Sequence, residues 1–148
     1  MTQPKDSIYR GDLIITSKAQ AKQYEHIAEV AGSIYISADV QLPVLTSVGG
    51  SLYIRADAQL PVLTSVGGVE ISMRPLAILG LQWPITILDR TMRIGCQEHS
   101  LDDWASFDDR KIAEMDWHNA VKFWALHKAS ILGAARDAGR VFGVEVAA

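Results

Sequence analysis

Short stretches of alternating hydrophobic and polar residues recur in the first half of the chain at an interval of 18 residues. Residues 32–50 read GSIYISADVQLPVLTSVGG, and residues 50–68 read GSLYIRADAQLPVLTSVGG. Self-similarity at such a period is typical of stacked units, each of which buries its apolar edge only against its neighbours. The pattern therefore predicts a repeat architecture. Degenerate copies flank the two clear ones, upstream at 11–15 and 24–32 and downstream at 69–71.

The alternation inside each copy predicts which side chains face the core, because every second residue of a strand points to the same side. One apolar set should stack copy upon copy in a parallel sheet of at least four strands: Ile34, Ile36, Leu52, Ile54, Val69 and Ile71. A second apolar set should form the opposite wall of the core: Leu42, Leu45, Val48, Leu60, Leu63 and Val66. Pro43 and Pro61 fit the irregular return path, and the glycine pairs at 49–50 and 67–68 permit a tight corner before each strand.

The spacing of the repeat also resembles a known class. From Leu42 to Asp57 the chain follows Leu-x-x-Leu-x-x-Val-x-x-x-Leu-x-Ile-x-x-Asp, which resembles a leucine-rich repeat. The closer resemblance is to the short LPxLTSVGGxLYI repeats of bacterial and phage proteins, and it covers residues 11–71, about 40% of the chain. Asp39 and Asp57 stand where that class has its ladder asparagine, and the period is shorter than usual. The resemblance implies a short β-solenoid with a parallel sheet.

After Ser72 the repeat ends, and the pattern predicts two further strands at 83–88 and 92–95, around a turn at 89–91, that end the sheet. Helix signals follow: Ser100-x-x-Asp103 and Ser106-x-x-Asp109 resemble capping boxes, so a short helix should begin at each. A longer helix should start with Asp116 as its N-cap and end at Gly139, with its apolar stripe docked on the open end of the repeats. That stripe consists of Trp117, Val121, Trp124, Ile131 and Ala135.

The expected fold class is therefore α+β: a short leucine-rich-repeat-like β-solenoid over 8–95 and a helical C-terminal cap over 96–148. Part of the tail, from Ile94 through Trp104 to Trp124, is similar to small bacteriophage proteins of unknown function. This similarity suggests a phage or prophage origin.

Length and composition narrow the class of protein. A chain of 148 residues with 49% hydrophobic and 21% charged residues suits one soluble globular domain. The polar start of the chain, with Lys5 and Asp6, lacks the apolar core of a secretory signal, so a cytoplasmic location in a bacterial host cell is expected. The single cysteine, Cys96, excludes an intramolecular disulfide and a cysteine-rich zinc module.

Charge is concentrated in one segment of the chain. The formal net charge is −3, but residues 97–116 contain seven acidic and two basic residues. The field of that segment should attract cations or basic protein surfaces and repel nucleic acid. Acidic residues also collect at helix N-termini for capping alone, and that interpretation stays open.

Few residues suggest chemistry. Cys96 and His99 have the spacing of half a metal site, or of a thiol beside a base, but a buried structural cysteine is the interpretation we favour. No nucleophile elbow, phosphate loop or metalloprotease motif occurs in the sequence. We therefore expect a protein that is not an enzyme and has no cofactor or metal. An enzyme or metal protein centred on Cys96 and His99 is the alternative, and a structural phage component is another.

Two groups of residues are candidates for binding a protein partner. The first lies on the outward face of the expected sheet, and it is either a contact surface or a face covered by solvent or by the cap: Tyr35, Tyr53 and Arg55. The second group is acidic: Glu98, Asp102, Asp103, Asp108 and Asp109. An acidic surface can imitate a phosphate backbone and occupy a nucleic-acid-binding groove on a partner. The sharpest hypothesis is thus a phage inhibitor of a bacterial nucleic-acid-binding defence complex, of the anti-CRISPR kind, that binds no nucleic acid or membrane directly.

Overall fold

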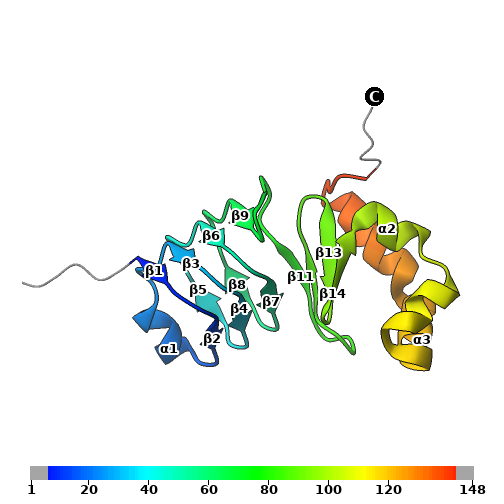
Figure 1. Cartoon of the computed structure of the whole chain (residues 1–148), viewed down its shortest axis with the longest axis horizontal. Coiled ribbons are helices and arrows are strands. Elements are labelled where there is room, and N and C mark those ends of the chain that lie inside the picture. The colour runs from blue at the N-terminus through cyan, green and yellow to red at the C-terminus, as the bar shows by residue number, and fades with distance from the viewer. Residues whose placement is uncertain (1–6, 143–148) are drawn as a thin grey trace, which may run out of the picture.

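The structure is a computed structural model that describes residues 7–142, with the side chains of 116–118 excepted. It has an α+β fold with mixed sheets and a C-terminal helix. Figure 1 shows the repeats at one end of the long axis, two helices at the other end, and a second group of strands between them.

The first sheet of the repeats is parallel and has three strands, β2 (Leu13–Ile15), β4 (Ile34–Ile36) and β7 (Leu52–Ile54). Leu52 and Ile54 pair with Ile34 and Ile36 in the register that the 18-residue repeat predicts. All four of these side chains are at most 2% exposed. The expected stacking of identical positions is therefore confirmed for these strands.

The residues expected in the opposite wall of the repeat core are buried, but the return path that carries them is not irregular throughout, because parts of it pair as strands. This wall is carried by a sheet in the order β1 (Ile8–Tyr9), β3 (Glu29–Val30), β6 (Ser47–Val48), β9 (Ser65–Val66) and β10 (Val69–Glu70), and by the parallel pair β5 (Val40–Gln41) and β8 (Ala58–Gln59). The six predicted wall residues, Leu42 to Val48 and Leu60 to Val66 at their spacing of three, are all buried. In the first copy a helix that the repeat pattern did not predict, α1 (Lys18–Gln23), occupies the inserted length, and Ser17 caps it.

Polar side chains hold successive copies together at three positions of the repeat. The Oγ of Ser33 accepts a hydrogen bond of 2.9 Å from the backbone N–H of Ser51, one copy on. Asp39 accepts in the same way from the N–H of Asp57 at 3.0 Å. The hydroxyl of Thr64 donates to the carbonyl of Thr46 at 3.2 Å. Each of these side chains satisfies a backbone group of the neighbouring copy.

The prediction of a fourth parallel strand at 69–71 is wrong. Val69 and Glu70 turn back and pair antiparallel with β9, so that Val69 lies opposite Val66 and is 56% exposed. Gly67 and Gly68 both have positive φ, 61° and 80°, as in the two-residue hairpin turns that fit the twist of paired strands. The third copy thus ends the parallel stack with a hairpin.

The residues after the repeats form a separate antiparallel sheet. Its order is β11 (Leu76–Ile78), β12 (Ile85–Ile87), β13 (Thr91–Ile94) and β14 (Gln97–Ser100). The strands expected at 83–88 and 92–95 are confirmed, but they do not end the parallel sheet, because they pair with β11 and β14. We call this sheet, with the helices that follow it, the tail.

The helices of the tail differ from the expected three. α2 (Leu101–Ser106) begins as predicted, with the Oγ of Ser100 accepting from the N–H of Asp103. A single helix, α3 (Asp109–Asp137), then replaces the expected short and long helices, and Asp108, not Ser106 or Asp116, is its N-cap. No proline or glycine interrupts 109–132, so nothing forces a break, and an aspartate inside a helix costs only a few tenths of a kcal/mol. The predicted end at Gly139 is confirmed, with φ of 75° and an N–H bonded to the carbonyl of Arg136.

The helical cap was expected to dock on the open end of the repeats, and this expectation is wrong. Instead, α3 packs on one face of the tail sheet, and the other face of that sheet lies against β7 (Figure 1). Two separate cores result, one inside the repeats and one between the tail sheet and its helices. The strands at 85–94, which we grouped with the repeats, share the core of the helices. Of the predicted helix stripe, Trp124, Ile131 and Ala135 are buried there, whereas the side chain of Trp117 lies outside the described residues.

Candidate binding surfaces

Tyr35 and Tyr53 lie side by side on the outward face of the parallel sheet, as the alternation predicts. Their rings stack with centroids 4.5 Å apart and planes 8° from parallel. Ile14 precedes them in the same row, since it pairs with Tyr35, and it is 54% exposed. We call Ile14, Tyr35 and Tyr53 the aromatic row. Arg55 directly follows β7 in the chain and is exposed beside the aromatic row.

One end of the aromatic row is covered by the tail. The guanidinium of Arg93 lies over the ring of Tyr53, 4.6 Å from its centroid, and its Nη1 is 3.4 Å from the tyrosine hydroxyl. The interpretation of a face covered by the cap therefore holds for Tyr53, although a strand and not a helix covers it. Ile14 is the exposed member of the row, and Tyr35 is half-buried.

Arg93 is a central residue of the contact between repeats and tail, and sequence analysis missed it. Only 8% of the residue is exposed, yet it makes four polar contacts. Its Nη2 donates to the Oγ of Ser51 at 2.8 Å and to a carboxylate oxygen of Glu98 at 2.7 Å. Its Nη1 donates to the carbonyl of Cys96 and contacts Tyr53. The one available signal was its place between Met92 and Ile94, which alternation puts on the face away from the helices.

The acidic candidates are only partly available to a partner. Glu98 forms an ion pair with Arg93, although 37% of its side chain is exposed. Asp108 accepts a hydrogen bond from the N–H of Lys111 at 2.9 Å as the cap of α3. Asp103 and Asp109 are exposed in the first turns of α2 and α3, and Asp102, in the first turn of α2, is half-buried. Asp103 and Asp109 are therefore the two exposed members whose carboxylates form no ion pair or hydrogen bond with a described residue.

The expected burial of Cys96 is wrong. Cys96 is exposed, not buried, because it stands at the tip of the two-residue turn between β13 and β14. The ring of His99 packs edge-on against Trp104 and Phe107 of the tail, with centroid distances of 5.2 and 4.9 Å. Burial lowers the pKa of His99 by more than the charge of Asp103 raises it. Within the described residues, no three histidine, cysteine or acidic side chains are grouped to hold a metal ion.

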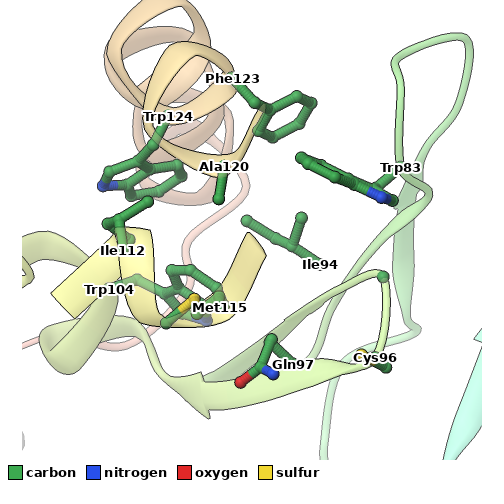
Figure 2. A pocket seen from close by; sticks show the side chains of 11 residues that line it. Trp83, Ile94, Cys96, Gln97, Trp104, Ile112, Met115, Ala120, Phe123 and Trp124 are labelled. Carbon is green, nitrogen blue, oxygen red and sulfur yellow. The ribbon is translucent and has the colours of Figure 1, made fainter. Parts of the chain in front are cut away.

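A pocket between the β13–β14 turn and the helices is a further candidate that the sequence did not reveal. Its cavity volume is about 150 Å³. Figure 2 shows aromatic rings on two sides of it, with the turn below. The described side chains and glycine that line it are Trp83, Ile94, Gly95, Cys96, Gln97, Trp104, Ile112, Met115, Ala120, Phe123 and Trp124. The aromatic residues come from three separate segments, so their spacing in the sequence gave no signal.

Asp89, in the turn between β12 and β13, ties the tail to the end of the repeats. Its carboxylate accepts hydrogen bonds from the N–H and the hydroxyl of Ser72, both at 2.7 Å, and from the N–H of Met73 at 3.0 Å. A guanidinium nitrogen of Arg140 lies 4.0 Å away. Burial raises the pKa of Asp89, but the hydrogen bonds and the charge of Arg140 together lower it below its ordinary value of 3.8.

We expect the substitution Asp89→Asn to destabilise the protein by about 1–2 kcal/mol near neutral pH, because it removes charge-assisted hydrogen bonds. A carboxylate whose folded-state pKa is lowered stabilises the fold above its unfolded pKa, and this contribution is lost as the pH falls through the folded pKa. The difference between wild type and variant in urea unfolding should therefore shrink as the pH falls below about 4. A difference that stays constant down to strongly acidic pH would contradict the role of the charge.

No family model matches this chain, and comparisons with curated proteins and with solved structures gave no match either. Within residues 7–142, no helix combines the length and the apolar character needed to cross a membrane.

Proposed function

We propose that the repeats are a short solenoid of the leucine-rich-repeat kind. Two features support this proposal: the parallel register of equivalent positions and the polar contacts between successive copies. Asp39 takes the place of the ladder asparagine of that class, since its carboxylate accepts from the next copy as an asparagine side chain would.

We propose that the protein is a non-enzymatic protein–protein interaction module and that the aromatic row is its contact surface. The observation that carries the proposal is the exposure of Ile14 beside a stacked pair of tyrosines on the outer face of the parallel sheet. Tyrosine is enriched at the energetic centres of interfaces, because it offers a large rigid ring with a polar end. The stacking against Tyr53 fixes the ring of Tyr35 before any partner binds, so little side-chain entropy remains to be lost.

The test is capture of one defined partner from a bacterial lysate by tagged wild type and by variants. Tyr35→Ser and Ile14→Ser should each weaken capture about tenfold, as expected of residues at the centre of an interface. Val44→Ser is the matched control, because Val44 is 43% exposed but lies on the return path outside the row. Equal capture by wild type and both row variants would refute the aromatic row as the contact surface.

A narrower form of the proposal names the partner class: a nucleic-acid-binding bacterial defence complex that the protein inhibits, as anti-CRISPR proteins do. The exposed carboxylates of Asp103 and Asp109 support this form, together with the excess of acidic residues in 97–116. Such a surface would compete with nucleic acid for a basic groove, and its binding would weaken as salt concentration rises.

Charge reversal separates the two forms of the proposal. Asp103→Lys combined with Asp109→Lys should weaken capture about tenfold at low salt and less at high salt. Glu25→Lys, an exposed acid at the end of α1, is the control and should leave capture unchanged. If the double reversal captures the partner as well as wild type does, the acidic surface is not the contact, whereas the aromatic row can still be.

A further inference from the structure

We propose that the pocket of Figure 2 is a binding site for a small, neutral, monocyclic aromatic molecule that has a hydrogen-bond acceptor. The site belongs to the tail and is distinct from the aromatic row and from the acidic residues. Four observations define the ligand: the volume of the cavity, the absence of charge on its described walls, the arrangement of its rings and the amide at its edge.

The volume sets the size of the ligand. The cavity measures about 150 Å³. Dry protein cavities of this volume that are lined by apolar residues bind benzene, whereas drug-sized ligands need two or more times the volume. A single aromatic ring with one or two small substituents therefore fits the cavity.

The walls set the charge of the ligand. Among the described residues that line the cavity, none has an acidic or basic side chain, and the thiol of Cys96 at the rim is the only titratable group. A charged molecule that entered would lose its hydration without gaining a partner, which is costly. The ligand should therefore be neutral at the pH at which it binds.

The rings of the walls favour an aromatic ligand over an aliphatic one of equal size. Trp83 and Phe123 meet edge to face, with centroids 5.0 Å apart, and Trp104 and Trp124 are tilted against each other at 5.3 Å. Both pairs border the cavity and present ring faces and edges to it (Figure 2). Aromatic groups attract one another in offset and edge-to-face geometry, so a ring between the pairs gains more than its burial alone provides.

Gln97 supplies a donor at the edge of the cavity. Its Oε1 lies 3.2 Å from Nε2 of His99, which fixes the carboxamide. Its amide nitrogen donates no hydrogen bond to any described residue. A ligand hydroxyl or carbonyl could accept that bond, since a carboxamide has two N–H donors.

The first experiment uses para-fluorophenol as the probe and follows its fluorine NMR signal while wild-type protein is added. Saturable broadening or shift of the signal is expected. Para-fluorobenzoate is similar in size but charged, so it should bind at least about tenfold more weakly than the phenol. Cyclohexanol should compete poorly for the same site. Absence of saturation with the phenol, or equal binding of the benzoate, would overturn the proposal.

A matched pair of alanine substitutions on α3 locates the site. Ala120 lines the cavity and is 7% exposed, so Ala120→Phe should fill it and reduce binding of the phenol about tenfold. Ala129→Phe makes the same change at an exposed position of the same helix and should leave binding unchanged. Equal binding by both variants would place the probe elsewhere on the protein.

The single cysteine gives a second measurement that needs no variant in the core. Cys96 is exposed and lies at the rim of the cavity, so its thiolate should react with iodoacetamide in the free protein. Saturating para-fluorophenol should slow this alkylation, and para-fluorobenzoate at the same concentration should not. An alkylation rate unchanged by the phenol would overturn the proposal even if Ala120→Phe fails to fold.

Discussion

Replacing Arg93 by methionine is expected to lower the free energy of unfolding by about 2–4 kcal/mol. Arg93 is 8% exposed and reaches from the tail to Ser51 and Tyr53 of the repeats, as well as to Glu98 of its own sheet. Removing one member of a buried ion pair leaves the other without its counter-charge and typically costs 3–5 kcal/mol. The expected loss is smaller here, because 37% of the Glu98 side chain is exposed and water can solvate it.

Urea unfolding measures this loss, and Arg55→Met is the matched control. Arg55 lies near the same face but is exposed and in no ion pair among the described residues, so its substitution should change the unfolding free energy by less than about 0.5 kcal/mol. Arg93→Met combined with Glu98→Gln should cost less than the two single losses added, since the pair is coupled. Equal stability of Arg93→Met and Arg55→Met would show that the contact between repeats and tail does not depend on the guanidinium.

The same substitution at equivalent glycines of two nearly identical copies is expected to be destabilising in one copy and nearly neutral in the other. Gly49→Asn should cost about 2–3 kcal/mol, as overpacking against rigid neighbours does. A Cβ at Gly49 would overlap the carbonyl oxygen of Ala31, which belongs to the backbone of the preceding copy and cannot move aside. Gly67→Asn should change stability by less than about 0.5 kcal/mol, because asparagine before glycine suits a two-residue hairpin turn.

The structural reason lies in the two different corners that one sequence forms. At Gly67 the φ of 61° is one that asparagine tolerates, and the nearest contact of an added Cβ is 3.4 Å from the carbonyl oxygen of Gly50. Thermal or urea unfolding of the two variants side by side measures the difference. Similar losses at Gly49 and Gly67 would mean that the third copy continues the parallel stack and does not turn into a hairpin.

Much of the repeat region could be predicted because its contacts are periodic. When two copies carry the same side chains at the same positions, stacking them in register buries every apolar residue at once, and a shift by one residue would expose the whole set. The pairing of Ile34 with Leu52 and of Ile36 with Ile54 therefore follows from the repeat alone. The start of α2 and the end of α3 were predictable for another reason, since Ser100 and Gly139 act within their own turn of helix.

The candidate site was less predictable, because its residues meet only through contacts between segments that do not repeat. The alternation correctly placed Tyr35 and Tyr53 on one face, but it could not indicate that Arg93 covers one of them. The exposure of Cys96 depends on where the β13–β14 turn falls, which the pairing of two non-periodic strands decides. The pocket requires Trp83, Trp104 and Phe123 from three segments, and no spacing in the sequence relates them.

The sequence by itself thus determined the register of the stacked copies, the side chains of their core and the local ends of two helices, since all of these depend on neighbours at fixed intervals. Tertiary structure decided where the stack ends, which sheet covers that end and which buried polar group joins the two cores. The hairpin at Gly67, the tail sheet against β7 and the contacts of Arg93 all arise where a periodic segment meets a segment without a period. At such a boundary the lowest free energy depends on the shapes of both surfaces together, and neither sequence pattern contains that information.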